Sequence, residues 1–260
     1  MPGTTSFRVA VTPPSAEPER KRLAWNTQAE TFTVRPYTSH CQVIHDEGAH
    51  AVIGISPGNS YFSHQRVLDL AVWGLRHFEQ VDLIYTDLHI TEMYEALGYG
   101  PHDARRKAVK NLRGVRAKVT NAVTTLDPDR SRMRGRPLSA LLGNTAYQKI
   151  RTGLDHHLAT DPDFRSVCQG LTDTFFTDKL ADGDPPTDRQ RDVCLAYICA
   201  EAPLFLDTPA ILGVPSSLNC YHQLLPLAEL LYARGPGLRA SRNQGHAVIT
   251  PSPQGDTHDG

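Results

Sequence analysis

Two short apolar runs separated by an amphipathic segment stand out in the first half of the chain. The runs are His50–Ile55 and Val81–Thr86, and each has the character of a buried parallel strand. Between them, Val67–Phe78 carries apolar residues at helical spacing. A strand, a helix and a second strand within about 35 residues predict a βαβ unit, whose parallel pairing requires a crossover over one face of the sheet.

The rest of the chain continues this alternation. Further strands are predicted over Thr31–Arg35, Cys41–Ile44, Ala210–Val214 and Ala247–Thr250. Helices are predicted over Ala104–Leu126, Leu138–Leu158, Asp163–Phe176, Arg189–Leu206 (stopped near Pro209) and Leu225–Ala233. The segment Arg130–Pro137 predicts a basic loop. Together these elements predict an α/β fold with a mostly parallel sheet.

Both ends of the chain are polar and contain proline or glycine. Residues 1–29 and 251–260 are therefore expected to be flexible tails outside the fold. The part between them has no internal repeat and no long linker, so residues 30–250 are predicted to form a single domain.

Composition and charge narrow the class of protein. Apolar residues make up 40% and charged residues 21% of the chain, as in a soluble globular protein. The net charge of −1 creates no overall field for nucleic acid or membranes, so polyanion binding would need a local patch. The five cysteines are scattered without a C-x-x-C pair, which favours reduced thiols in a cytoplasm. Neither a membrane span nor a signal peptide is expected.

The turn after the first apolar run, Gly54-Ile55-Ser56-Pro57-Gly58, matches the G-x-S-x-G pattern of a nucleophile elbow. A hydroxyl group at this point faces the crevice where α/β sheets bind ligands, although the segment is also a plausible plain turn. About 30 residues of predicted structure precede Ser56, too few for an α/β hydrolase. The lysine of a Walker A loop is absent. A nucleophilic Ser56 would therefore take a substrate that is already activated.

The predicted helix over residues 104–126 carries a stripe of positive charge. No acidic residue interrupts its basic residues, Arg105, Arg106, Lys107, Lys110, Arg113, Arg116 and Lys118. Five of them share one face, while Ala108, Val109, Leu112, Val115 and Val119 form the opposite, core-facing side. Such a stripe fits a polyphosphate backbone contacted without sequence readout, and a merely solvated helix face is the alternative.

Two further pairs place polar groups in apolar surroundings. Tyr197 and Glu201 are four residues apart in an apolar helix, where a buried carboxylate needs a partner. They fit either a structural hydrogen bond or an anionic pocket for an ammonium group, such as a substrate α-amine. Tyr221 and His222 follow a predicted parallel strand and are expected at the same sheet edge as Ser56, with core packing as the alternative.

Three blocks in order resemble the cyclodipeptide synthases, which build a 2,5-diketopiperazine from two aminoacyl-tRNAs. The blocks are Gly54–Phe62, Tyr197-x-x-x-Glu201-Ala-Pro-Leu-Phe, and Val214-Pro-Ser-Ser-x-x-Cys220-Tyr221-His222. The resemblance extends from about His45 to Thr250. Asn59, Tyr221 and His222 match the subfamily named for these three residue types. The stretches ARRKAVKNLRGVRAK and AEAPLFLDTPAILGVPSSLNCYHQ are similar to the actinobacterial cyclodityrosine synthase branch.

The resemblance implies a Rossmann-type domain with helices on both sheet faces, similar to the catalytic domain of class Ic aminoacyl-tRNA synthetases but without ATP-binding signatures. It implies a cytoplasmic aminoacyltransferase, monomeric or homodimeric, that forms cyclo(Tyr-Tyr) from tyrosyl-tRNA. No cofactor, metal, DNA or membrane partner is expected.

The resemblance also implies roles for individual residues. Ser56 would accept the first aminoacyl group as an ester, and Tyr197 and Glu201 would hold its ammonium group. Tyr221, positioned by Asn59 and His222, would relay a proton. Tyr147 matches another active-site tyrosine. The pocket lining is expected to comprise Val52, Gly54, Leu83, Tyr85, Leu138 and Leu204. The acceptor arm of tRNA is expected to contact Arg105, Arg106, Lys107, Lys110, Arg113 and Arg116.

Two departures from the family pattern stand out. Pro57 replaces alanine and removes a backbone N–H that could stabilise an oxyanion. Gln223-Leu224 lies where some relatives carry an acidic residue. Two other functions stay open, a serine esterase that ignores tRNA and a non-catalytic RNA binder that forms no serine ester.

Overall fold

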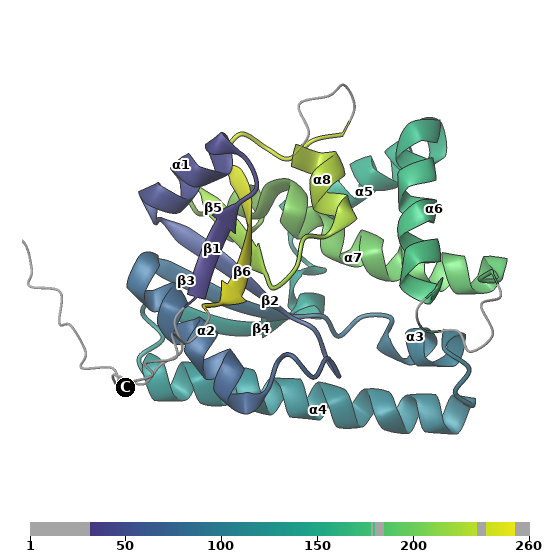
Figure 1. Ribbon diagram of the computed structural model, residues 1–260, viewed down its shortest axis with the longest axis horizontal. Coiled ribbons are helices and arrows are strands. Elements are labelled where there is room, and N and C mark those ends of the chain that lie inside the picture. The colour runs from purple at the N-terminus through teal and green to yellow at the C-terminus, as the bar shows by residue number, and fades with distance from the viewer. Residues whose placement is uncertain (1–31, 178, 180–184, 233–237, 253–260) are drawn as a thin grey trace, which may run out of the picture.

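A six-stranded sheet with the order β1-β6-β5-β2-β3-β4 forms the centre of the molecule (Figure 1). This computed structural model describes residues 32–177, 179, 185–232 and 238–252, so the predicted tail over residues 1–29 and most of residues 251–260 lie outside the described part. The strands are β1 (Phe32–Pro36), β2 (His50–Ile55), β3 (Gln80–Tyr85), β4 (Met133–Pro137), β5 (Ser217–Tyr221) and β6 (Gln244–Pro251). Every neighbouring pair is parallel except β1 with β6.

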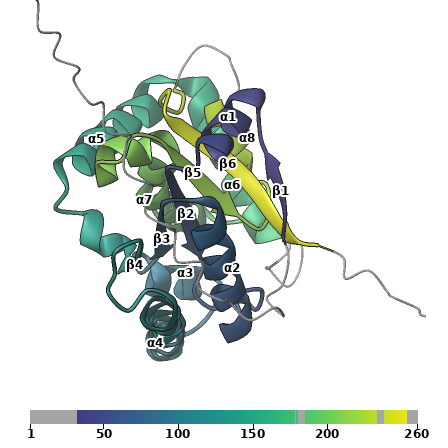
Figure 2. The same ribbon diagram turned by 90° about the vertical axis from the view of Figure 1, so that its left-hand side faces the viewer.

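Helices cover both faces of this sheet (Figure 2). They are α1 (Ser39–Glu47), α2 (His64–His77), α3 (Ile90–Ala96), α4 (Pro101–Leu126), α5 (Thr145–Thr160), α6 (Pro162–Thr177), α7 (Asp188–Leu212) and α8 (Pro226–Tyr232), with the 3₁₀ helix η1 at Leu138–Leu141. Helices α1, α2 and α4 share one core with the sheet, and α5 and α7 pack against the other face. The predicted α/β architecture is confirmed.

The predicted βαβ unit is confirmed as β2, α2 and β3. Val52 pairs with Asp82 in the parallel register, and Ser63 caps the start of α2 by accepting a hydrogen bond from the backbone N–H of Arg66. Because side chains alternate along a strand, Ile53 faces α2 and Val52 faces α7. The two faces of β2 therefore belong to different cores.

The predicted strand over Cys41–Ile44 is wrong, since this segment lies inside α1. Thr38 caps the helix by accepting from the N–H of Cys41, and Gly48 ends it in the left-handed conformation. Cys41 and Ile44 are three residues apart and bury the same helical face. Capping and this spacing outweigh the β propensity of a short run.

The predicted basic loop over Arg130–Pro137 contains the edge strand β4. Met133 to Pro137 of β4 pair one by one with Val81 to Tyr85 of β3, through backbone hydrogen bonds that do not depend on the side chains. The predicted single helix Leu138–Leu158 is also interrupted, because Asn144 caps a new helix, α5, after η1.

The predicted strand over Ala210–Val214 is wrong, because α7 continues to Leu212 past Pro209. The helix kinks at Asp207 (φ −160°, ψ 65°), whose carboxylate accepts from the N–H of Ala210 at 3.1 Å and so caps a new helical turn. A proline in the first turn after a cap loses no helical hydrogen bond. The strand follows as β5, at Ser217–Tyr221.

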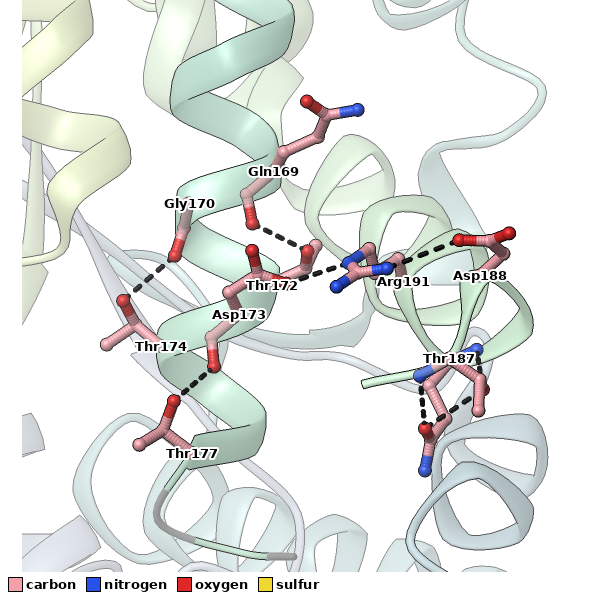
Figure 3. Close-up of polar contacts among 10 residues, drawn as sticks. Gln169, Gly170, Thr172, Asp173, Thr174, Thr177, Thr187, Asp188 and Arg191 are labelled. Atoms are coloured by element: carbon pink, nitrogen blue, oxygen red, sulfur yellow. Dashed lines mark hydrogen bonds and ion pairs between the residues drawn. The ribbon is translucent and has the colours of Figure 1, made fainter. Parts of the chain in front are cut away.

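Helix α7 is tied to α6 at its start (Figure 3). Thr187 and Gln190 form a reciprocal capping box, and the Arg191 guanidinium binds the Asp173 carboxylate at 2.8 Å. By length and hydropathy α7 could cross a bilayer, but 56% of its apolar window is buried against the other elements. We interpret it as a core helix.

Candidate active site

Ser56 and Tyr221 meet at the carboxyl ends of the neighbouring parallel strands β2 and β5. Ser56 directly follows β2, and Tyr221 is the last residue of β5. The two strands are paired next to these residues, where Ile53 of β2 is the partner of Cys220 of β5. The hydroxyl oxygens of Ser56 and Tyr221 are 2.8 Å apart and share a hydrogen bond. This is the ligand-binding edge of an open α/β sheet, as the sequence predicted for both residues.

The turn that carries Ser56 packs directly against α3 and α4. Gly58 has a φ of 75°, and a Cβ atom there would lie 2.6 Å from the amide nitrogen of Asn111 and 2.7 Å from the hydroxyl of Tyr94. Only glycine fits both the backbone conformation and this space. Gly54, on the strand before Ser56, lies beside the Tyr221 ring. A Cβ atom added at Gly54 would be 3.5 Å from that ring, an ordinary contact distance.

Asn59, Tyr221 and His222 come together as the sequence predicted. The Asn59 amide nitrogen is 3.3 Å from Nε2 of His222, and the Asn59 side chain also hydrogen-bonds Tyr221. The Asn59 Oδ1 atom accepts from the N–H of Tyr61, which fixes the amide orientation. The His222 ring stacks on Tyr61 with centroids 4.1 Å apart. Burial, assisted by the charge of Arg66, lowers the pKa of His222.

The phenol of Tyr221 stays protonated at neutral pH. Burial raises the pKa of Tyr221 to about 12, although the hydrogen bond with Ser56 opposes the rise. The nearby Glu201 charge raises it further, so the carboxylate influences the Ser56 and Tyr221 pair electrostatically. Tyr221 can therefore donate a proton to Ser56 or exchange one with it, but does not act as a standing anion.

A second polar cluster joins β3 to α7 beside this pair. The Thr86 hydroxyl donates to the Glu201 carboxylate, and the Tyr197 hydroxyl hydrogen-bonds with both residues. Burial raises the pKa of Glu201, while the hydrogen bonds from Thr86 and Tyr197 lower it. Burial also raises the pKa of Tyr197 well above its ordinary value. The cluster is a desolvated carboxylate held by two hydroxyl groups, which suits a cationic partner.

Thr86 was not predicted as a site residue, although the sequence holds the signal for it. Thr86 follows β3 at the same sheet edge as Ser56, and alternation along the strand places Asp82, Ile84 and Thr86 on one face. Ile84 packs with Val52 on the α7 side, which makes Thr86 the polar end of that row. Thr86 could have been predicted from the sequence, because every second residue from Asp82 onward lies on the same face of the strand.

The predicted pocket-lining residues divide between two cores. Val52, Leu138, Tyr147 and Leu204 cluster together on the α5 and α7 side. Leu83 and Tyr85 lie on the opposite face of β3, in the core shared with α2 and α4, so the prediction that they line the same pocket is corrected. The reason is again the alternation along a strand. Leu83 and Tyr85 are the immediate neighbours of Ile84, so their side chains point to the opposite face of the sheet.

Tyr147 anchors α5 to the helix that carries Glu201. Its buried hydroxyl donates to the backbone carbonyl of Ala200 at 2.8 Å. Burial raises the pKa of Tyr147. The side chain therefore fixes the position of α7 one residue before the carboxylate.

The exposed surface of α4 carries five of the predicted basic residues. Arg105, Arg106, Lys110, Arg113 and Arg116 are exposed. The helix passes the Ser56 turn, since its Asn111 contacts Gly58 and the amino group of Lys118 donates to the carbonyl of Phe62 at 2.6 Å.

Three details of this face differ from the prediction. Lys107 is half-buried, with its amino group 3.9 Å from the ring centroid of Tyr99. The acid-free stripe is partly neutralised at its start, because Arg106 pairs with the preceding Asp103 at 3.0 Å. Val109 was assigned to the core side but is 58% exposed. The helix is rotated so that Ala104, Ala108 and Val115 face the core.

No cluster of three or more His, Cys, Asp or Glu side chains suitable for a metal ion occurs in the described part of the chain. The five cysteines are buried and unpaired. Burial raises the pKa of Cys168 and Cys194 to about 12, so their thiols are protonated and inert at neutral pH.

The chain is similar to known proteins over a range that includes all three motif blocks. The sequence model of the family described as cyclodipeptide synthase matches residues 32–251. The chain is 60% identical over 231 residues to the cyclo(L-tyrosyl-L-tyrosyl) synthase of Mycobacterium tuberculosis, covering 89% of this chain and 80% of that protein. It is 34% identical over 215 residues to the cyclo(L-leucyl-L-phenylalanyl) synthase of Streptomyces noursei, covering 83% and 90%.

Solved structures show the same relationship. A Mycobacterium tuberculosis structure, described as demonstrating that cyclodipeptide synthetases are related to type I tRNA synthetases, aligns with a TM-score of 0.81 and 61% identity over 87% of this chain and 96% of that one. A cyclo(L-leucyl-L-phenylalanyl) synthase aligns with a TM-score of 0.77 and 32% identity, covering 85% and 99%. The predicted relation to the synthetase fold is confirmed.

Proposed function

Because the chain belongs to the cyclodipeptide synthase family, we propose that it converts two tyrosyl-tRNAs into cyclo(L-Tyr-L-Tyr) through an aminoacyl ester on Ser56. The observation that carries this proposal is the 2.8 Å hydrogen bond between the Ser56 and Tyr221 hydroxyl groups, beside the desolvated Glu201 carboxylate. The choice of tyrosine is supported by the 60% identical relative.

In the first step, Ser56 Oγ attacks the ester carbonyl of tyrosyl-tRNA. A new ester bond forms to Ser56, the bond to the tRNA ribose breaks, and the ribose oxygen takes the proton that Ser56 loses. One ester replaces another, so the step needs positioning and oxyanion stabilisation but no ATP. The proton relay through Tyr221, which is protonated and within hydrogen-bond distance of Ser56, belongs to the later steps that form or cyclise the dipeptide.

Glu201 and Tyr197 hold the ammonium group of the tethered tyrosine. A buried carboxylate is unfavourable without a cation, and the substrate ammonium supplies one. Thr86 keeps the carboxylate in place through its hydroxyl. This arrangement fixes the amino acid at both ends, by its ester to Ser56 and by its ammonium at α7.

In the second step, the tethered amine, after losing a proton, attacks the ester of a second tyrosyl-tRNA. A peptide bond forms, the second tRNA leaves with its ribose hydroxyl restored, and a dipeptidyl ester remains on Ser56. The free amine of the dipeptide then attacks this ester, closes the six-membered ring and returns the proton to Ser56 Oγ. Splitting one condensation into acyl exchanges is the usual advantage of a covalent intermediate.

Docking of the tRNA is assigned to the exposed basic face of α4, formed by Arg105, Arg106, Lys110, Arg113 and Arg116. Helix α4 itself contacts the Ser56 turn through two other residues, Asn111 and Lys118. Phosphates along an acceptor arm would be neutralised there, and the acylated end would reach Ser56.

Expression in a bacterium, followed by mass spectrometry of the medium, tests the product. We expect cyclo(Tyr-Tyr) from the wild type and from Ser60→Ala, an exposed serine in the same turn, and none from Ser56→Ala. Purified protein given labelled tyrosyl-tRNA should retain the label after acid denaturation and lose it with hydroxylamine. A Ser56→Ala variant that still makes the product would contradict the serine ester.

Two other outcomes would favour a different function. Hydrolysis of small esters without any tRNA dependence would favour an esterase, and tRNA binding with no label on the protein would favour a non-catalytic binder.

A further inference from the structure

The nucleophile loop, residues 56–62, begins with a tight turn that carries Ser56. The N–H of Asn59 donates to the carbonyl of Ser56 at 3.4 Å, and Pro57 and Gly58 form the corners between them. A proline followed by a residue with positive φ, here 75° at Gly58, is the pattern of a type II β-turn. Side chains from α3 and α4 meet this turn at its second corner. The direction in which the serine presents its hydroxyl group therefore depends on how that corner is held.

Two hydrogen-bonded side chains hold the corner from outside. The Asn111 amide of α4 donates to the Tyr94 hydroxyl of α3. Both groups lie so close to Gly58 that a Cβ atom there would be 2.6 Å from the amide nitrogen and 2.7 Å from the hydroxyl oxygen. Asn111 and Tyr94 are half-buried, which protects their hydrogen bond from competition with water. The proposed chemistry at Ser56 uses neither residue.

Lys107 extends this contact to the ring of Tyr94. Its amino group lies 5.1 Å from the ring centroid of Tyr94 and 3.9 Å from that of Tyr99, and it donates to the Tyr99 hydroxyl. The two tyrosine rings meet edge to face, with centroids 5.7 Å apart. Attraction between a cation and an aromatic ring fixes the position of the ring. The charge of Lys107 is therefore used inside the protein, on the residue that contacts the turn.

Lys107 and Asn111 belong to a polar side of α4 that faces the nucleophile loop. The third member is Lys118, whose amino group donates to the carbonyl of Phe62 at 2.6 Å. At about 100° per residue, the three residues lie within about 40° of one another around the helix, and all three are half-buried. The exposed Arg113 is about 160° away from Asn111. Helix α4 therefore holds the nucleophile loop with one side and presents cations to solvent with another.

We propose that Asn111 and Tyr94 are positioning residues for Ser56. Lys107 acts with them through the Tyr94 ring, and not as an RNA contact. Together they hold the turn in the geometry that places the Ser56 hydroxyl 2.8 Å from that of Tyr221. Attack on an ester depends strongly on orientation, since a displacement of about 1 Å can cost about 100-fold in rate. The inference rests on the proposed function, because it concerns the rate at which Ser56 is acylated.

Single-turnover labelling by radioactive tyrosyl-tRNA tests this role. At saturating tRNA, we expect Asn111→Leu and Tyr94→Phe each to slow the labelling of Ser56 about ten-fold, the effect of one lost hydrogen bond. The affinity for tRNA should stay at the wild-type value. The double variant should be no slower than either single variant, because both remove the same hydrogen bond. Asn111→Asp should recover most of the rate, since its carboxylate can accept a hydrogen bond from the Tyr94 hydroxyl.

Other variants of α4 separate positioning from docking. The control is Asn121→Leu, because the Asn121 amide nitrogen is 3.0 Å from Nε2 of His64, beyond the nucleophile loop. This variant should keep the wild-type labelling rate and affinity. Arg113→Ala should weaken tRNA binding and make the slope of log affinity against log salt shallower by about one. Lys107→Met should instead keep the wild-type slope and slow the labelling.

Amide hydrogen exchange in peptides that cover the nucleophile loop measures the turn without any substrate. Exchange should be faster in Asn111→Leu and Tyr94→Phe than in the wild type or Asn121→Leu. Labelling at the wild-type rate in both variants would overturn the positioning role, as would a loss of rate fully explained by weaker tRNA binding. A wild type that tyrosyl-tRNA never labels would instead refute the proposed function. The exchange rates would then still decide whether Asn111 and Tyr94 hold the turn.

Discussion

Thr86 donates its hydroxyl hydrogen to the carboxylate of Glu201, and this contact links the end of β3 to the middle of α7. Strand and helix come from distant parts of the chain, so the contact fixes where the carboxylate stands relative to the strand ends. Thr86 acts through Glu201 and is a positioning residue. Its removal should affect the reaction without removing any reacting group.

We expect Thr86→Val to reduce the rate of diketopiperazine formation about ten-fold, the equivalent of one hydrogen bond to a charged group. The Thr86 hydrogen bond lowers the pKa of Glu201, so its loss should raise that pKa and shift the acidic limb of the pH–rate profile to higher pH. Thr86→Ser should restore both the rate and the profile. An unshifted profile in Thr86→Val would show that the threonine only fills space.

The sequence alone predicted an element or a site residue correctly where one local feature, such as a buried apolar strand, was strong. After His50, the segment Ala51–Ile55 has no polar side chain because both faces of β2 are buried, and Ser56 was identified because it follows such a strand. Tyr221 was placed at the correct sheet edge although its strand was predicted some residues too early. The predicted edge was still correct, because Tyr221 follows the falsely predicted strand and is itself the last residue of β5, and both place it at the carboxyl end of a strand.

The remaining elements depend on contacts that a local pattern does not contain. The β4 segment Met133–Pro137 has two arginines, a glycine and a proline, and becomes a strand only because β3 offers a free edge. Helix α7 passes Pro209 only because Asp207 caps a new turn there. Thr86 becomes a site residue only because Glu201 arrives from α7.

We expect Tyr221→Phe to block the steps after acylation. The phenol has a pKa of about 12, so it serves as a protonated relay, and losing a general acid or base typically slows a step by about 10²–10⁴-fold. Labelled tyrosine should still become attached to Ser56, while cyclo(Tyr-Tyr) falls below detection in the single-turnover assay. Tyr37→Phe, far from Ser56 on the β1 side, should behave like the wild type.

A buried serine, histidine and aspartate at the other end of the strands imitate a catalytic triad. Ser217 Oγ is 2.8 Å from Nδ1 of His50, and Nε2 of His50 is 3.1 Å from the Asp82 carboxylate, which also pairs with Arg136 at 2.8 Å. Ser217 and His50 are fully buried, so no substrate reaches them. We interpret the group as a structural network.

Accordingly, Ser217→Ala should retain labelling by tyrosyl-tRNA, in contrast to Ser56→Ala. Asp82→Asn should lower the free energy of unfolding by about 3 kcal/mol, because it leaves the Arg136 charge and His50 without their partner. Urea denaturation measures the second effect. If a folded Ser217→Ala protein no longer formed the serine ester, the nucleophile would be Ser217, and the assignment of catalysis to Ser56 at the opposite end of the sheet would be wrong.

His246 should make the protein sensitive to acid. Burial lowers the pKa of His246 to about 4 from an ordinary value of 6.5, so the unfolded chain binds a proton more tightly than the folded one. The stability that depends on neutral His246 is complete above pH 6.5 and is lost as the pH falls towards 4, by about 3 kcal/mol at most. Free energies of unfolding for His246→Phe should vary less over this interval, whereas His102→Phe, at an exposed site, should follow the wild type.

The basic face of α4 is expected to act through those of its cations that form no ion pair with another described residue. Arg113→Glu with Arg116→Glu should weaken aminoacyl-tRNA binding about 100-fold at low salt, with the difference shrinking as salt rises, because phosphate contacts release counterions. Arg106→Glu alone should have less effect than Arg113→Glu alone, since Asp103 already neutralises much of the Arg106 charge. Arg35→Glu with Lys149→Glu provides the same change in net charge away from α4. Equal weakening by both double variants would mean that overall charge, and not this face, governs tRNA binding.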